Sequence, residues 1–185
     1  MEFELIIKET ELKGAYVIDL EKKEDLRGFF ARFFCEREFE QYGLEPHIAQ
    51  MSMALNLKKG TFRGIHFQRP PQQENKIVRC TRGAVYDVII DLRKNSATYR
   101  QSFGVELTAD NYRMIYIPKD FGHGYVTLED DTELMYSMSQ CYTPGAEDGI
   151  RFNDPGFLIK WPADISIKIV SERDKSWPDY CHDTH

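Results

Sequence analysis

The sequence contains no run of eighteen apolar residues and no basic N-terminal segment followed by an apolar one, so it predicts neither a membrane span nor a secretory signal. Its four cysteines are widely spaced, without a Cys-x-x-Cys pair or a zinc-finger spacing. We therefore expect a reduced, cytoplasmic protein. Basic residues are also in the minority, 24 against 30 acidic ones, and the net charge of −6 argues against a nucleic-acid or anionic-membrane binder.

The 185 residues suffice for a single domain with a substantial core. Between residues 48 and 142, short apolar segments follow one another closely, separated by turn residues and by no helical pattern. This pattern favours an all-β fold of antiparallel strands, and a cupin-like jelly-roll β-barrel fits the number of segments. We expect residues 1–47 to add N-terminal strands and one short helix, and residues 143–185 to form an irregular or short helical segment over one end of the barrel.

The expected elements have the following boundaries. A helix is predicted over 36–42, ended by Gly43. Strands are predicted over 15–20, 29–34, 50–56, 61–68, 76–81, 84–92, 102–108, 114–117, 124–128 and 133–142.

One stretch places three polar side chains of different chemistry, Arg63, His66 and Lys76, within fourteen residues. The apolar residues around them alternate as in strands, and Pro70 marks a turn between two strands that we expect to be adjacent. Strict alternation puts Arg63 and His66 on opposite faces, so both reach one cavity only if Gly64 bulges or kinks the strand. A half-buried hairpin whose polar groups are merely solvated remains the alternative.

Three further side chains are candidates for the same site. His123 stands between two glycines, which would let backbone approach a ligand, although a structural hydrogen bond is the commoner role for such a histidine. Tyr136 shares strand parity with Leu134, so its ring is expected to face the interior. Asp174 lies among charged residues, and taken alone it is predicted to be on the surface.

A metal site is the obvious rival, since jelly-roll barrels often hold a metal through histidines and a carboxylate. Here the first strand reads His66-Phe67-Gln68 and has no His-x-His. Only His66, Glu74 and His123 could act as ligands, so we predict that no metal is bound.

Nine segments with a common order and spacing carry a family resemblance, among them Gly60-Thr-Phe-Arg-Gly-Ile-His-Phe-Gln68. They are residues 25–30, 60–68, 76–79, 86–93, 117–124, 142–147, 153–155, 161–162 and 171–174. Together they resemble the dTDP-4-dehydrorhamnose 3,5-epimerase family of nucleotide-sugar enzymes. The resemblance implies a cupin-like barrel, a homodimer whose N-terminal strands reach into the partner's site, and epimerisation, without a cofactor, of a 4-keto-6-deoxy sugar attached to a nucleoside diphosphate.

The resemblance also implies roles for the catalytic residues. His66 would be the base, Asp174 the carboxylate that orients its ring, and Lys76 the cation beside the carbonyl oxygen. Tyr136 would return a proton to the opposite face of the sugar. The residues that would bind the substrate are Arg27, Phe30, Gln50, Arg63, His123, Tyr142, Glu147 and Arg173.

The sequence departs from the family where the nucleotide base should be held. Arg32 replaces an acidic residue, Ser52 an asparagine and Cys141 an aromatic one. Either another nucleotide is accepted or thymine is held by different contacts. An epimerase that acts on a single carbon and a non-catalytic cupin that binds sugar nucleotides remain alternatives.

Overall fold

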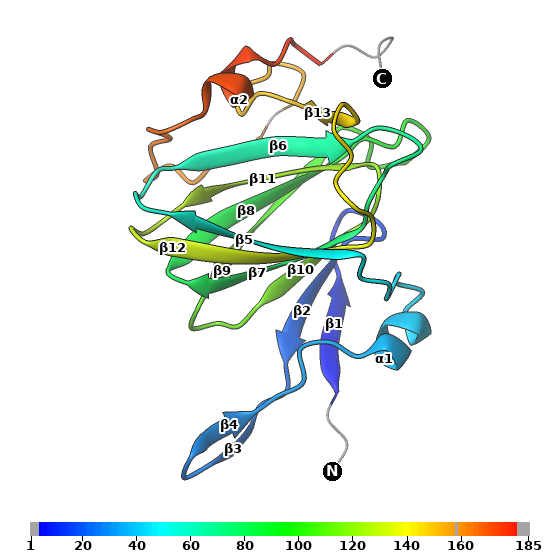
Figure 1. The fold of residues 1–185 in the computed structure, drawn as a ribbon, viewed down its shortest axis with the longest axis vertical. Helices are drawn as coiled ribbons and strands as arrows, with labels where there is room; N and C mark the ends of the chain where they lie inside the picture. The colour runs from blue at the N-terminus through cyan, green and yellow to red at the C-terminus, as the bar shows by residue number, and fades with distance from the viewer. Residues whose placement is uncertain (1–3, 158, 181–185) are drawn as a thin grey trace.

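The computed structural model describes residues 4–157 and 159–180, and these fold into two facing β-sheets with antiparallel strand pairs (Figure 1). The six-stranded sheet has the order β1 (Leu5–Glu9), β2 (Tyr16–Leu20), β10 (Met114–Ile117), β7 (Lys76–Arg82), β12 (Thr132–Met138) and β5 (Gln50–Asn56). The five-stranded sheet has the order β13 (Glu147–Gly149), β6 (Phe62–Gln68), β11 (Phe121–Thr127), β8 (Ala84–Asp91) and β9 (Ser102–Thr108). The all-β, cupin-like jelly-roll prediction is confirmed.

The main core lies between the two sheets, where the inward-facing residues of both meet. Val85 and Ile89 of β8 pack there with Leu107, Ile115 and Leu134, all at most 1% exposed. Burial of such side chains stabilises the fold by roughly 1.5–3 kcal/mol each. The alternation of the strand residues thus explains why two sheets form one unit.

The segment after β13 covers the outer face of the five-stranded sheet. Ile150 and Phe157 pack there against Phe62 and Ile90, which explains why β8 is apolar on both faces. The end of this segment, which includes α2 (Glu172–Ser176), lies beside β6 (Figure 1).

The N-terminal residues form a separate extension of the six-stranded sheet. Helix α1 (Glu36–Gln41) buries Phe39 completely against β1, β2 and β10, and Gly43 follows it with φ +68°. Strands β3 (Lys23–Asp25) and β4 (Gly28–Phe30) form a hairpin that projects away from α2, at the opposite end of the molecule (Figure 1). Neither helix in the described part of the chain is long enough to cross a membrane.

Several predicted boundaries are wrong. The strand predicted over 29–34 ends at Phe30, and the one predicted over 133–142 ends at Met138. Strand β11 begins three residues before the predicted strand, so His123 lies inside it because Gly122 and Gly124 allow close contact with β6 and do not interrupt pairing.

The predicted adjacency of the strands that carry His66 and Lys76 is also wrong. β6 and β7 belong to opposite sheets, so the chain crosses between the sheets after Gln68. Their side chains can meet only across the space between the sheets.

Candidate active site

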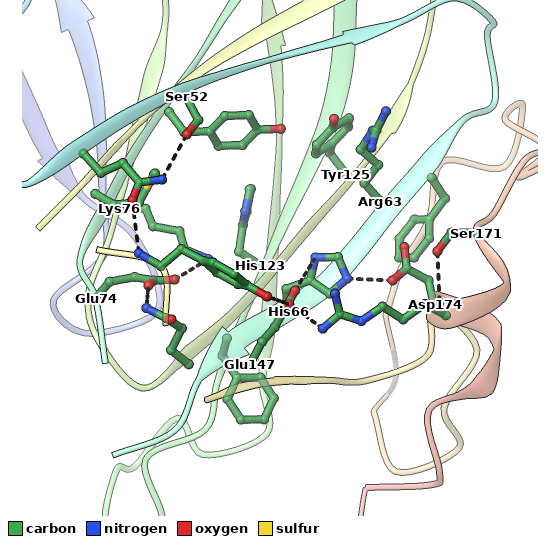
Figure 2. Close-up of a pocket in the computed structure, with 18 of the residues that line it drawn as sticks. Ser52, Arg63, His66, Glu74, Lys76, His123, Tyr125, Glu147, Ser171 and Asp174 are labelled. Carbon is green, nitrogen blue, oxygen red and sulfur yellow. Dashed lines mark hydrogen bonds and ion pairs between the residues drawn. The ribbon is translucent and has the colours of Figure 1, made fainter. Parts of the chain in front are cut away.

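A cavity of about 670 Å³ opens between the two sheets on the side of α2. It takes side chains from both sheets and from the segment that leads into α2 (Figure 2). The sequence-predicted residues that line it are Gln50, Arg63, His66, Lys76, His123, Tyr136, Tyr142, Glu147, Arg173 and Asp174. Ten candidates scattered over 125 residues therefore meet in one place.

The expected irregularity at Gly64 is confirmed. On β11, His123 pairs with His66 and Tyr125 pairs with Arg63, so three steps along β6 match two along β11. This is a β-bulge, and it turns Arg63 and His66 into the same cavity. Gly64 has φ +132°, and a Cβ atom there would lie 2.5 Å from the Cα atom of Gly124.

His66 is paired with Asp174, the residue that the sequence alone assigned to the surface. That assignment is wrong, since Asp174 is 3% exposed and its Oδ1 lies 2.6 Å from His66 Nε2 (Figure 2). Ser171 caps the short helix α2 by accepting a hydrogen bond from the backbone N–H of Asp174 at 3.0 Å. The cap fixes the start of α2, and this points the carboxylate at β6.

Asp174 is held in its ionised form. Burial raises its pKa, but the hydrogen bond and the charge of His66, together with the N–H of Gly64, outweigh this, so the pKa of Asp174 lies below its ordinary value. A carboxylate at Nε2 keeps a proton on that nitrogen and leaves Nδ1 as the basic nitrogen of the ring.

The Nδ1 side of His66 faces a second group of polar side chains. Glu147 Oε1 lies 3.9 Å from His66 Nδ1, and the other oxygen of Glu147 accepts hydrogen bonds from Arg173 and, at 3.2 Å, from the hydroxyl of Tyr142. The backbone N–H of Tyr142 in turn donates to Gln50 Oε1 at 3.1 Å. These contacts form a polar rim around His66.

Lys76 reaches the same cavity from the facing sheet. Its ammonium lies 3.0 Å from Glu74 Oε1, and the two side chains are 13% and 9% exposed. Gln68 donates a hydrogen bond to the other oxygen of Glu74. The cation is therefore fixed in position at the cavity wall.

His123 is tied to a carboxylate that the sequence did not indicate. Asp87 is fully buried, and its Oδ2 lies 2.8 Å from His123 Nε2, while its Oδ1 has no hydrogen-bond partner within the described residues. Burial raises the pKa of Asp87, although His123 and Lys76 act in the opposite direction. Asp87 thus orients the His123 ring from behind the cavity.

Tyr136 stands on the wall opposite His66, since β12 and β6 belong to facing sheets. Burial raises the pKa of Tyr136 well above its usual value of 10, so the phenol holds its proton firmly. The prediction that the ring faces the interior is confirmed.

Other predicted residues lie elsewhere in the chain. Arg27 and Phe30 are on the β3–β4 hairpin, are exposed, and do not line the cavity of their own chain. Among the positions that depart from the family, Ser52 lines the cavity, whereas Arg32 pairs with Glu38 at 2.8 Å and Cys141 is exposed.

The donor set does not resemble a metal centre. Among residues 4–157 and 159–180, no three His, Cys, Asp or Glu side chains gather as a metal ion requires. His66 and His123 each have one ring nitrogen beside a carboxylate. The absence of a bound metal stays a prediction.

Sequence reasoning missed Asp87, Tyr125 and Asn56, which surround the cavity behind His123 and Tyr136. Tyr125 is two residues after His123 in β11 and so faces the same side. Because the strand was predicted to begin at Gly124, His123 lay outside it and the shared face was not recognised. The two-residue spacing of His123 and Tyr125 is the sequence signal that could have identified Tyr125.

Comparisons with known proteins show to which family this chain belongs. The family model described as dTDP-4-dehydrorhamnose 3,5-epimerase matches residues 9–181. A protein of that name from Methanothermobacter thermautotrophicus is 40% identical over 169 residues, which cover 91% of this chain and 90% of the relative.

Solved structures give the same result. The enzyme of that name from Elizabethkingia anophelis superimposes with a TM-score of 0.91 at 34% identity and covers 95% of this chain and 96% of its own. The dTDP-6-deoxy-D-glucose-3,5-epimerase of Legionella pneumophila, solved with dTDP-4-keto-L-rhamnose, gives 0.86 at 31% identity and covers 94% and 92%. This chain belongs to the dTDP-4-dehydrorhamnose 3,5-epimerase family.

Proposed function

We propose that this protein inverts both carbons that flank the ketone of a nucleoside-diphosphate 4-keto-6-deoxyhexose, with the dTDP-linked gluco sugar as substrate and the rhamno sugar as product. The observation that carries this proposal is the placement of His66 and Tyr136 on facing walls of one cavity. A base on one face of the sugar and an acid on the other are what inversion at carbon requires.

His66 Nδ1 would remove the proton beside the ketone, and the electron pair of the broken C–H bond would move to the carbonyl oxygen. Asp174 stabilises the imidazolium that forms, because it stays ionised at 2.6 Å from Nε2. Lys76, held by Glu74, would stabilise the enolate oxygen. Tyr136 would then donate its proton to the same carbon from the other side. Once His66 has released its proton to solvent and Tyr136 has taken one up, a second round at the other carbon would complete the reaction.

Neither carbon changes its oxidation state in this sequence, so we propose that no redox cofactor takes part. Because the inversions at the two flanking carbons are the same reaction, one base and one acid suffice for both. The described cysteines Cys35, Cys80 and Cys141 are free thiols, which supports a reducing, cytoplasmic location.

We propose that Arg63, His123 and Arg173 hold the sugar and the diphosphate, and that Gln50, Tyr142 and Glu147 hold the nucleotide. Support comes from their common place in the cavity wall. Arginine suits a diphosphate because its planar fork donates two hydrogen bonds at once. Because Ser52 also lines this wall, the nucleotide base that the protein prefers has to be measured.

We further propose a homodimer in which Arg27 and Phe30 complete the partner's site. Both lie on the projecting β3–β4 hairpin, where Leu26 is fully exposed and Phe30 is 65% exposed. The edge strand β5 also presents Met51 and Met53 to solvent. An apolar edge of this kind is normally covered in the working protein.

Mixing two inactive variants tests the dimer. Arg27→Ala has an intact base but would lack the partner's arginine, whereas His66→Ala has the arginine but no base. If the hairpin serves the partner, mixed dimers formed by co-expression contain one complete site and regain activity. No recovery in mixed dimers would show that the hairpin does not act on the partner's site.

The activity itself is tested in heavy water with dTDP-4-keto-6-deoxyglucose, and deuterium is followed by NMR. Deuterium at both flanking carbons is expected, with inversion at each. Deuterium at one carbon would make the protein a single-carbon epimerase, and none with any nucleotide would overturn the proposal. His66→Ala should abolish exchange, while His47→Ala, at an exposed histidine outside the cavity, should leave it unchanged.

A further inference from the structure

Two buried side chains behind Tyr136 have no part in the mechanism so far. Tyr125 of β11 and Asn56, the last residue of β5, are each 2% exposed. Figure 2 shows Tyr125 beside Arg63 at the cavity wall. The ring centroids of Tyr125 and Tyr136 are 6.5 Å apart, and the two ring planes are tilted by 38°.

The hydrogen bonds of Asn56 fix which way each proton points. Its Nδ2 donates to the carbonyl of Thr132 at 3.2 Å, so Oδ1 faces Arg63 Nε at 2.8 Å and the hydroxyl of Tyr125 at 3.3 Å. Because an arginine nitrogen can only donate and Oδ1 can only accept, this amide orientation is the one that satisfies every group. Tyr125 therefore gives its proton to Asn56 and directs none at Tyr136.

We propose that Tyr125 is a positioning residue for Tyr136, the proposed acid. The Tyr125 hydroxyl has two settings, meaning two orientations of its hydrogen, and the charge of Tyr136 determines which one it adopts. In the resting setting it donates to Asn56. After proton transfer it turns and donates to the new phenolate. The inference rests on the proposed role of Tyr136 as the acid.

The proton count is balanced in this step. The O–H bond of Tyr136 breaks, the enolate electron pair forms the new C–H bond with that proton, and the O–H electrons remain on Tyr136 as a phenolate. An ionised oxygen is a stronger acceptor than a neutral amide, so it attracts the Tyr125 proton away from Asn56. Asn56 Oδ1 keeps its bond from Arg63 at 2.8 Å, and no buried acceptor is left without a partner.

The setting matters because the phenolate forms in a buried place, where an anion without a donor is strongly disfavoured. Loss of one hydrogen bond to a charged group corresponds to a rate loss of about 10- to 150-fold. Only the step that uses Tyr136 should suffer this loss, since His66 lies on the other wall.

Tyr125→Phe tests the proposal through two readouts in heavy water. Deuterium in unconverted substrate reports proton removal and return by His66 on one face, and deuterium in epimerised product reports donation by Tyr136. We expect the variant to lose inversion about 10- to 150-fold while exchange into unconverted substrate stays near the wild-type rate. An unchanged ratio of the two rates, or an equal loss of both, would overturn the proposal.

A matched control is Tyr116→Phe. Tyr116 is 4% exposed, and its hydroxyl accepts a hydrogen bond from the N–H of Glu45 at 3.1 Å, away from the cavity. It removes an equally buried hydroxyl and should leave the ratio unchanged. Thermal unfolding of both variants checks that each is folded.

A second variant, Asn56→Asp, makes the competing acceptor anionic. The aspartate should hold the Tyr125 proton away from the phenolate and so slow inversion relative to exchange. If the ratio of inversion to exchange stayed at the wild-type value, the Tyr125 hydroxyl would not switch between two settings. Wild type and Tyr136→Phe are measured in the same series, so that a failure of the proposed function can be told apart from a failure of the positioning role. If wild type shows no exchange, or Tyr136→Phe inverts normally, the proposed function fails; if these behave as expected, the result for Tyr125→Phe bears on the positioning role alone.

Discussion

The bulge at Gly64 brings His66 and Arg63 into one cavity, and Gly64→Ala tests whether a glycine is required there. Gly64 has φ +132°, and an added Cβ would lie 2.5 Å from Gly124 Cα and 2.9 Å from the carbonyl oxygen of His123. These neighbours are backbone atoms of a paired strand, so they cannot rotate away. The variant must move β6 relative to β11 or adopt a different bulge.

Two terms set the size of the effect. A positive φ costs a residue with a Cβ roughly 1–2 kcal/mol, and overpacking of a close contact costs about 1–3 kcal/mol. Together they predict a loss of about 2–5 kcal/mol, or a fall in Tm of about 4–20 °C for a chain of this size. Because His66 follows the bulge by two residues, kcat should fall as well.

Gly43→Ala is the matched control, since Gly43 has φ +68° and no atom within 4 Å of an added Cβ. It should lose only the backbone term of about 1–2 kcal/mol and keep full activity. Urea unfolding and kcat/KM of both variants provide the comparison. If Gly64→Ala were as stable as Gly43→Ala and fully active, the close approach of the two strands would not be what requires glycine.

Three further predictions concern the buried pair of Lys76 and Glu74, the carboxylate of Asp174 and the exposed edge strand β5. Lys76→Met should lower kcat about 10²- to 10³-fold; adding Glu74→Gln should recover the stability lost with the buried pair, measured by thermal unfolding, but not the rate. The carboxylate of Asp174, whose pKa is lowered in the folded protein, contributes stability that is present above its unfolded pKa and is lost as pH falls through the folded value, so urea unfolding of wild type and Asp174→Asn should converge between about pH 5 and pH 2. A constant difference over that range would contradict the pairing. Met53→Asp, on the exposed side of the edge strand β5, should shift sedimentation from dimer towards monomer, and an unchanged mass would place the interface elsewhere.

The amino-acid sequence was sufficient to predict the all-β fold and most strands, because alternation in segments such as 76–81 and 102–108 reflects which side chains are buried. It failed where local signals mislead. Phe33 and Phe34 have high β-propensity but follow a strand that ends at Phe30, and the strand predicted to begin at Gly124 begins at Phe121. Pairing with neighbouring strands decides such boundaries, and it is not a local property.

Most candidate residues of the site were recognisable through the family resemblance of the sequence, and strand alternation by itself indicated the need for a bulge at Gly64. The tertiary structure decided how they meet. It pairs His66 with Asp174 across 108 residues, and it buries an aspartate that its charged neighbours made appear exposed. Long-range pairs of this kind depend on the packing of the C-terminal segment against the five-stranded sheet, because only that packing brings α2 to β6.

The opposite wall depends on tertiary structure in the same way. The chain crosses from β6 to β7 between the two sheets, which places Lys76 and Tyr136 opposite His66, and the contacts of Tyr125 with Asn56 join strands from both sheets. The sequence by itself therefore determined which groups this protein has and which strands carry them. Only the packing of one sheet on the other decided that His66 and Tyr136 face each other, because periodicity along a strand records burial but not the identity of the strand across the core.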